Sequence, residues 1–175
     1  IIQTLITCTI LPLVSIVLMW KINLIKTLHI DDRMERIGPY IAMLIFLLWY
    51  YLNIGLYGVA PIFRLYILGG IITLFLMFFA NLFMKVSLHA AGIAGVFINL
   101  VIAQQLFSYS TLIFHFQDAY YQLSFQIILI IALLILFIIL LSRFYLRKHN
   151  LTELLAGLVL GFFGQVVASR LIDIL

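Results

Sequence analysis

Six long apolar runs dominate this sequence, and each approaches the length needed to cross a lipid bilayer. We predict spans at residues 2–20, 40–57, 65–84, 87–107, 123–141 and 151–172. A spanning helix needs about 20 mostly apolar residues, and 66% of this 175-residue chain is hydrophobic. Only helices and closed barrels satisfy the backbone in lipid, and the runs lack the alternation of barrel strands. The sequence therefore predicts an all-α, polytopic membrane helical bundle of about six transmembrane helices, forming one domain over residues 1–175.

The connections between the spans divide the cations unequally between the two membrane faces. We call the face reached at the end of the first span side X, and the opposite face side Y. Loops 21–38 and 142–150 and the junction 85–86 lie on side X and carry eight of the ten Lys and Arg residues. Loop 58–64, loop 108–122 and the C-terminus lie on side Y. We expect 108–122 to form an interfacial loop or short helix, because it is rich in aromatic residues.

The composition argues against nucleic-acid binding, a metal site and a transporter. The formal net charge is +4, but the cations are too few and too interleaved with spans to indicate nucleic-acid binding. The single cysteine, Cys8, excludes an intrachain disulfide and a thiolate metal site. The four histidines fall on both faces, with His115 on side Y and His29 matching no pattern, so we expect no metal and no cofactor. No ionisable group lies near the middle of a span, which argues against a transporter.

Residues 142–153 concentrate charge between the last two spans. Ser142 and Arg143 are followed after five residues by His149, and Glu153 follows after three more. A cation can hold a phosphate, and a histidine can attack it when a carboxylate fixes the tautomer of the ring. His149 is therefore a candidate nucleophile, with Glu153 as its orienting partner. Asn150 and Glu153 also have the spacing of a capping box, so a plain helix start is an alternative.

A second polar segment, residues 85–89, begins the fourth span on the same face. Lys85, Ser87 and His89 occupy alternate positions there. The N-terminus of a helix binds anions, so Ser87 is a candidate phosphate ligand and Lys85 could assist it. A capping serine followed by a histidine at headgroup level is the alternative.

A third polar segment, residues 26–36, contains Lys26, Arg33 and Arg36. Arginine suits bidentate phosphate binding, and lysine neutralises phosphate as a point charge. The alternative is a positive loop whose acids and bases pair with each other. The pattern leaves open whether Arg33 or Arg36 binds phosphate.

Small residues predict which helices pack closely. Ala90 and Ala91 lie early in the fourth span, and Gly157 and Gly161 lie four residues apart in the sixth. Small residues let membrane helices approach each other. Contact between these two spans would bring their N-terminal histidines together.

The polar segments resemble the signatures of the type 2 phosphatidic acid phosphatase superfamily. Residues 142–153 match the third signature, with Glu153 where the family has aspartate. Ser87 and His89 match the second signature, Pro-Ser-Gly-His, although Val86 and Leu88 replace the proline and the glycine.

The first signature of that family is Lys, six residues, then Arg-Pro. Lys26 and Arg33 have this spacing, although Met34 replaces the proline. The resemblance implies a metal-independent membrane phosphatase acting on a lipid phosphate. His149 would attack phosphorus and form a phosphohistidine, while His89 would protonate the leaving lipid alcohol and later activate water. The phosphate would be held by Lys26, Arg33 or Arg36, Lys85, Ser87, Ser142 and Arg143.

Two other functions stay open from the sequence. One is a lipid phosphotransferase, and the other is a non-catalytic lipid-phosphate-binding or structural membrane protein. The identity of the lipid and the oligomeric state are also open. We expect a bacterial inner (cytoplasmic) membrane protein. The excess of cations favours a cytoplasmic side X, whereas many bacterial members of the family act on the outer face.

Overall fold

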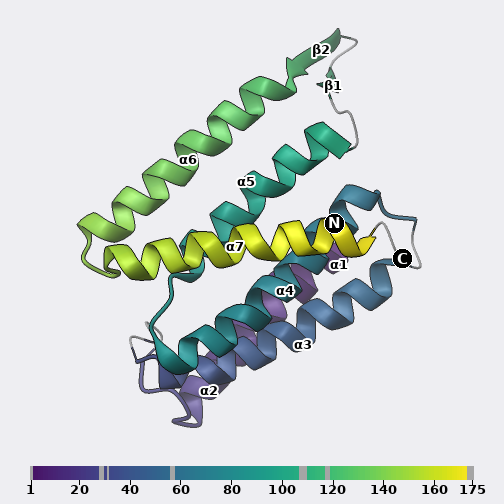
Figure 1. Cartoon of the computed structure of the whole chain (residues 1–175). Helices are drawn as coiled ribbons and strands as arrows, with labels where there is room; N and C mark the ends of the chain where they lie inside the picture. The colour runs from purple at the N-terminus through teal and green to yellow at the C-terminus, as the bar shows by residue number, and fades with distance from the viewer. Residues whose placement is uncertain are drawn as a thin grey trace.

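Six membrane-spanning helices make up most of the structure (Figure 1). The computed structural model describes residues 2–27, 30, 32–55, 58–106, 110–116 and 119–172. Within this part, six helices are long and apolar enough to cross a membrane, which confirms the predicted all-α bundle. The first span comprises α1 (Ile2–Leu5), a π-helical turn η1 (Ile6–Ile10) and α2 (Leu11–Lys21). The other spans are α3 (Ile37–Ile54), α4 (Pro61–Phe83), α5 (Leu88–Leu106), α6 (Phe125–Tyr145) and α7 (Leu151–Ile172), and a 3₁₀ turn, η2 (Met34–Arg36), precedes α3.

Helix α7 lies at the centre of the bundle and packs along both α4 and α5 (Figure 1). Glycines make this approach possible. A Cβ atom added to Gly161 would overlap the carbonyl oxygen of Ala91, and one added to Gly157 would lie 2.5 Å from the carbonyl oxygen of Ser87. The predicted close contact between the fourth and sixth spans is confirmed, and it joins the N-terminal ends of α5 and α7.

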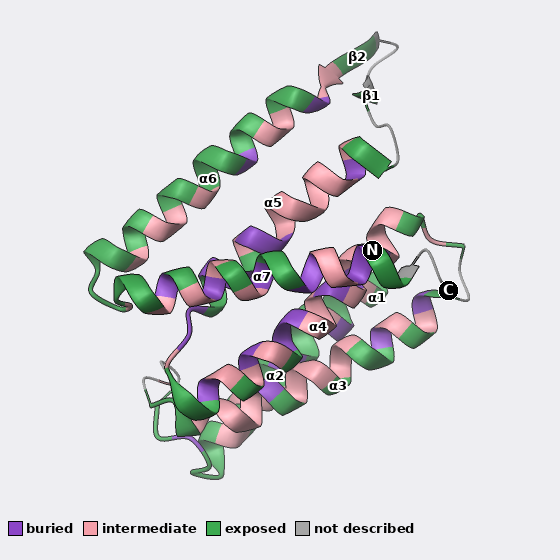
Figure 2. Ribbon diagram, in the orientation of Figure 1, coloured by how far each residue is buried: buried purple, intermediate pink, exposed green. Residues whose placement is uncertain are grey.

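Helix α6 stands at the edge of the bundle and packs mainly on α5. Much of its surface is exposed (Figure 2), including the large apolar side chains of Ile130, Phe137 and Ile138. Exposed apolar side chains are favourable on a helix whose surroundings are hydrocarbon.

Most helix boundaries differ from those predicted by one to three residues, and two differ by four. Helix α4 begins at Pro61 instead of residue 65, because proline at the first turn loses no helical hydrogen bond. Helix α6 continues to Tyr145 instead of ending at residue 141, so Ser142 and Arg143 are helical. The Ser142 hydroxyl donates to the Ile139 carbonyl oxygen at 2.9 Å. Arg143 lies in the last turn, where a cation complements the helix dipole.

The expectation of a loop or short helix at 108–122 was wrong for the described residues of that segment. They form an antiparallel hairpin of β1 (Thr111–Phe116) and β2 (Ala119–Ser124). The Phe125 N–H donates to the Ser110 carbonyl oxygen at 2.9 Å and closes the base of the hairpin. Aromatic and β-branched residues favour strands, and in this segment that preference and the cross-strand hydrogen bonds prevail.

A buried cluster fills the side X end of the bundle beside the polar segments. It contains Tyr40 from α3, Leu74 and Met77 from α4, Val86 from the α4–α5 link and Ala91 from α5. This core fixes three helices relative to the link that carries Lys85 and Ser87.

Candidate active site

His149 and Glu153 form a hydrogen-bonded pair at the start of α7. The His149 Nδ1 atom lies 2.7 Å from the Glu153 Oε2 atom. Their side chains are only 8% and 16% exposed, so the pair is largely withdrawn from solvent. Glu153 lies in the first turn of α7, whereas His149 lies in the link just before the helix, so the pair joins the link to the helix start.

The start of α7 is capped by a different residue. The Asn150 Oδ1 atom accepts hydrogen bonds from the Glu153 N–H at 2.9 Å and from the Thr152 hydroxyl at 2.8 Å. The N-cap interaction predicted for Asn150 is therefore present. Because Asn150 performs the capping, the carboxylate of Glu153 is able to orient His149.

The pairing determines which ring nitrogen of His149 can react. An ionised carboxylate only accepts hydrogen bonds, so the Nδ1 atom must carry the proton that lies between the two groups. The Nε2 atom then keeps its lone pair. Burial lowers the pKa of His149 below its ordinary value of 6.5, against the opposing effect of Glu153, and Lys85 and Arg36 lower this pKa further. A neutral imidazole at pH 7 is the nucleophilic form.

Ser87 is a structural link between the second and third polar segments. It is fully buried, and its hydroxyl accepts a hydrogen bond from the Ala90 N–H at 3.3 Å, as an N-cap does. Its own N–H donates to the Glu153 carbonyl oxygen at 3.2 Å. Ser87 therefore positions the start of α5 against the start of α7.

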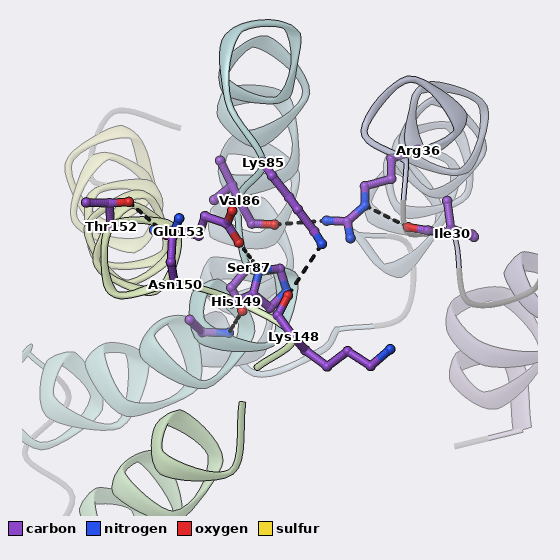
Figure 3. A network of polar contacts seen from close by, with 11 residues as sticks. Ile30, Arg36, Lys85, Val86, Ser87, Lys148, His149, Asn150, Thr152 and Glu153 are labelled. Carbon is purple, nitrogen blue, oxygen red and sulfur yellow. Dashed lines mark hydrogen bonds and ion pairs between the residues drawn. The ribbon is translucent and has the colours of Figure 1, made fainter. Parts of the chain in front are cut away.

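Arg36 joins the first polar segment to the second (Figure 3). Its Nε atom donates to the Ile30 carbonyl oxygen at 3.0 Å, and its Nη1 atom donates to the Val86 carbonyl oxygen at 3.2 Å. Lys85 makes a comparable link to the third segment, because its Nζ atom donates to the Lys148 carbonyl oxygen at 3.4 Å. These bonds hold the guanidinium and the ammonium groups close to His149.

A cavity of about 300 Å³ lies where the three segments meet. Its basic lining residues are Arg36, Lys85, His89, Arg143, Lys148 and His149. Its apolar lining comes mainly from α2, α3 and α4, and includes Pro12, Ile16, Pro39, Ala42, Met43 and Leu74. Both candidate catalytic histidines therefore border one space that is cationic at one end and apolar at the other.

The sequence does not decide whether Arg33 or Arg36 binds phosphate, but only one of them lines the cavity. Arg36 lines it, whereas Arg33 is directed to the end of α4 and donates to the Phe83 carbonyl oxygen at 2.6 Å. Lys26 also lies outside the lining, with a side chain 84% exposed and an ion pair to Glu35 at 3.9 Å. Ser142, bonded within α6, is not part of the lining either.

Sequence reasoning missed Lys148 and the apolar wall. Lys148 directly precedes His149 and follows Arg147, whose left-handed φ of 51° turns the chain between α6 and α7. Its position beside the candidate nucleophile was the available signal. No local pattern marked Pro12 and Ile16, because they reach the cavity only through the packing of α2.

The sequence predicts no metal site, and the structure describes the side chains of two of the four histidines, His89 and His149. Among the residues that the structure describes, no group of three or more His, Cys, Asp or Glu side chains could hold a metal ion. His29 lies outside the described residues, and the side chain of His115 is not described. Comparison with known proteins adds no assignment to this geometry: no family model, no curated protein and no solved structure matches the chain.

Proposed function

We propose that this protein is an integral membrane phosphatase that removes phosphate from a lipid phosphate through a phosphohistidine intermediate. One observation carries the proposal: His149, which is paired with Glu153, borders the same cavity as His89, and this cavity has a cationic end and an apolar wall. The resemblance of the three polar segments to the lipid phosphatase signatures supports the same chemistry. We place the protein in a bacterial inner membrane on that resemblance.

Four cations at the cavity would bind the phosphate group. Arg36, Lys85, Arg143 and Lys148 line it. Arginine and lysine donate charge-assisted hydrogen bonds to phosphate oxygens, and preorganised cations stabilise the charge that is redistributed during phosphoryl transfer. Arg36 is the arginine of the first segment that we assign to this role.

In the first chemical step, the Nε2 lone pair of His149 forms a bond to phosphorus. The ester P–O bond breaks, and the departing lipid oxygen takes a proton from protonated His89. Glu153 stabilises the positive charge that develops on the His149 ring, because its carboxylate accepts the Nδ1 hydrogen bond. The products of this step are the lipid alcohol and a phosphohistidine.

In the second step, water replaces the histidine. Neutral His89 accepts a proton from the water as its oxygen bonds to phosphorus. The N–P bond breaks, its electron pair returns to Nε2 of His149, and inorganic phosphate is released. Both histidines are then restored to their starting protonation states.

Phosphate release from a short-chain phosphatidic acid by the purified protein tests the proposal. We expect turnover by the native chain and nearly complete loss in His149→Ala. His115→Ala is the matched control, because the sequence places this histidine on the opposite face, and we expect it to stay active. Substantial release by His149→Ala would contradict the assignment. Phosphate transfer that depends on an added alcohol would instead indicate the phosphotransferase, and binding without any turnover would indicate the non-catalytic protein.

A further inference from the structure

One position on α5 beside the cavity, Gly92, carries no side chain. Leu88 and His89 line the cavity at the start of the helix. Gly92 follows them by four and three residues, so it lies on the same face one turn further along. Gly92 is exposed, and a Cβ atom added to it would meet nothing within 4 Å.

The opposite face of α5 accounts for the packing of this helix. Ala90, Ala91, Ala94 and Gly95 are buried, and Ala91 and Gly95 lie against α7. Gly92 therefore takes no part in the glycine-mediated packing of the bundle. The space beside Gly92 is open, since no atom lies within 4 Å of a Cβ at this position.

The apolar wall of the cavity comes mainly from α2 and α3. Pro12 and Ile16 of α2 and Ala42 and Met43 of α3 line it. In the described part of the chain, neither α2 nor α3 packs extensively against α5 or α6. No helix contact therefore closes the cavity between its apolar wall and the free face of α5.

The chemistry of the lining defines the occupant of this opening. The cations at one end attract a phosphate, and the apolar wall favours hydrocarbon. A volume of about 300 Å³ is at the small end of ligand pockets. It accommodates the headgroup and only the first part of a long chain, so the remainder must leave through the side.

We propose that the hydrocarbon chain of the lipid phosphate leaves the cavity between α5 and the α2–α3 wall, across Gly92, and that the absence of a side chain at Gly92 determines which chains fit. This inference rests on the proposed function, since it concerns the substrate of the same site. A leucine at position 92 would project into the route, and an alanine would fill only its edge. Helical geometry tolerates both residues better than glycine.

The first test compares turnover of hexadecyl phosphate and hexyl phosphate by the purified protein. We expect Gly92→Leu to lower the ratio of kcat/KM for the long chain to that for the short chain about tenfold, and Gly92→Ala to lower it less. Ala60→Leu is the matched control, because Ala60 is an exposed small residue preceding α4 on side Y. An unchanged ratio in Gly92→Leu would overturn the proposed route.

The second test measures occupancy and does not depend on catalysis. Cys8 is the only cysteine, so Gly92→Cys in a Cys8→Ala background offers one thiol for reaction with N-ethylmaleimide in detergent. We expect hexadecyl phosphate to slow this reaction several-fold, and inorganic phosphate to leave its rate unchanged. Protection without turnover would retain the route and reject hydrolysis. Equal labelling rates with and without hexadecyl phosphate would reject the route, whether or not the protein is a phosphatase.

Discussion

His149 experiences opposing influences on its protonation. Burial, Lys85 and Arg36 lower its pKa below 6.5, while the hydrogen bond and the charge of Glu153 raise it, and the net shift is downward. The neutral ring therefore predominates at pH 7, and it becomes protonated only as the pH falls through the lowered pKa. We predict that the acid limb of a kcat/KM profile has its midpoint below pH 6.5. A midpoint above that value would show that this limb does not report His149.

Substitution of Glu153 by glutamine tests the orienting role. The variant loses the carboxylate charge but keeps the backbone N–H that Asn150 caps. We predict a loss of kcat of at least about tenfold, or roughly 1.4 kcal/mol of barrier. Because both effects of Glu153 raise the pKa of His149, the acid limb should also move to lower pH. An unchanged rate and profile would leave Glu153 with only a structural role.

Variants of Lys26 and Arg143 test whether the sequence spacing or the cavity identifies the phosphate-binding residues. The sequence pattern predicts both as phosphate-binding residues, but only Arg143 lines the cavity. We predict that Arg143→Ala lowers kcat/KM by about tenfold or more, the cost of one charge-assisted hydrogen bond. Lys26→Ala should change it by less than about twofold, as expected for an exposed ion pair. Equal losses in phosphate-release assays of the two variants would contradict the assignment of this cavity.

At the scale of elements, the contact between α5 and α7 decides whether the site assembles. Ser87 and Glu153 are joined across it through a backbone hydrogen bond, and Gly161 allows the approach to Ala91. Gly161→Val would force the helices apart, since its Cβ overlaps backbone atoms. We predict that it lowers the free energy of unfolding by about 2 kcal/mol, as overpacking does.

Chemical unfolding in detergent micelles measures this effect, with Gly92→Ala as the control. A Cβ atom at Gly92 meets open space, so this variant should be neutral or slightly more stable. Equal stabilities of the two variants would show that α5 and α7 do not require close contact at Gly161.

At the scale of the whole molecule, the distribution of cations predicts which face carries the site. Eight of the ten Lys and Arg residues lie on side X. Four of these line the cavity, and setting them aside leaves Lys21, Lys26, Arg33 and Arg147 against Arg64 and Arg170 on side Y. The remaining excess still predicts a cytoplasmic side X.

Cysteine labelling in intact cells measures this orientation. Tyr145 is 88% exposed at the side X end of α6, and Ala60 is exposed on side Y. In a Cys8→Ala background, we expect a membrane-impermeant maleimide to label Ala60→Cys and to spare Tyr145→Cys. The reverse pattern would place the site on the outer face.

The sequence by itself determined the features that depend on local chemistry. Hydrophobicity accumulates along a run of residues, so the six spans were predictable, and their number assigned each loop to a face. The His149–Glu153 pair was predictable because the two residues lie close together in one polar segment and a carboxylate suits the orientation of a histidine ring. The hairpin at β1 and β2 was missed because a short aromatic stretch is compatible with strand, loop and helix until its pairing partner is known.

Only the tertiary structure decided the features that depend on residues far apart in the sequence. Arg36, and not Arg33, reaches the cavity because Val86, fifty residues away, provides its acceptor. Ser87 became a buried cap instead of a cavity residue because α7 packs over it through Gly157. Pro12 and Ile16 became a wall of the site only when α2 packed beside α3. Spacing along the chain fixes neighbours within a helix turn, whereas the position of a side chain across a bundle depends on how all the helices pack.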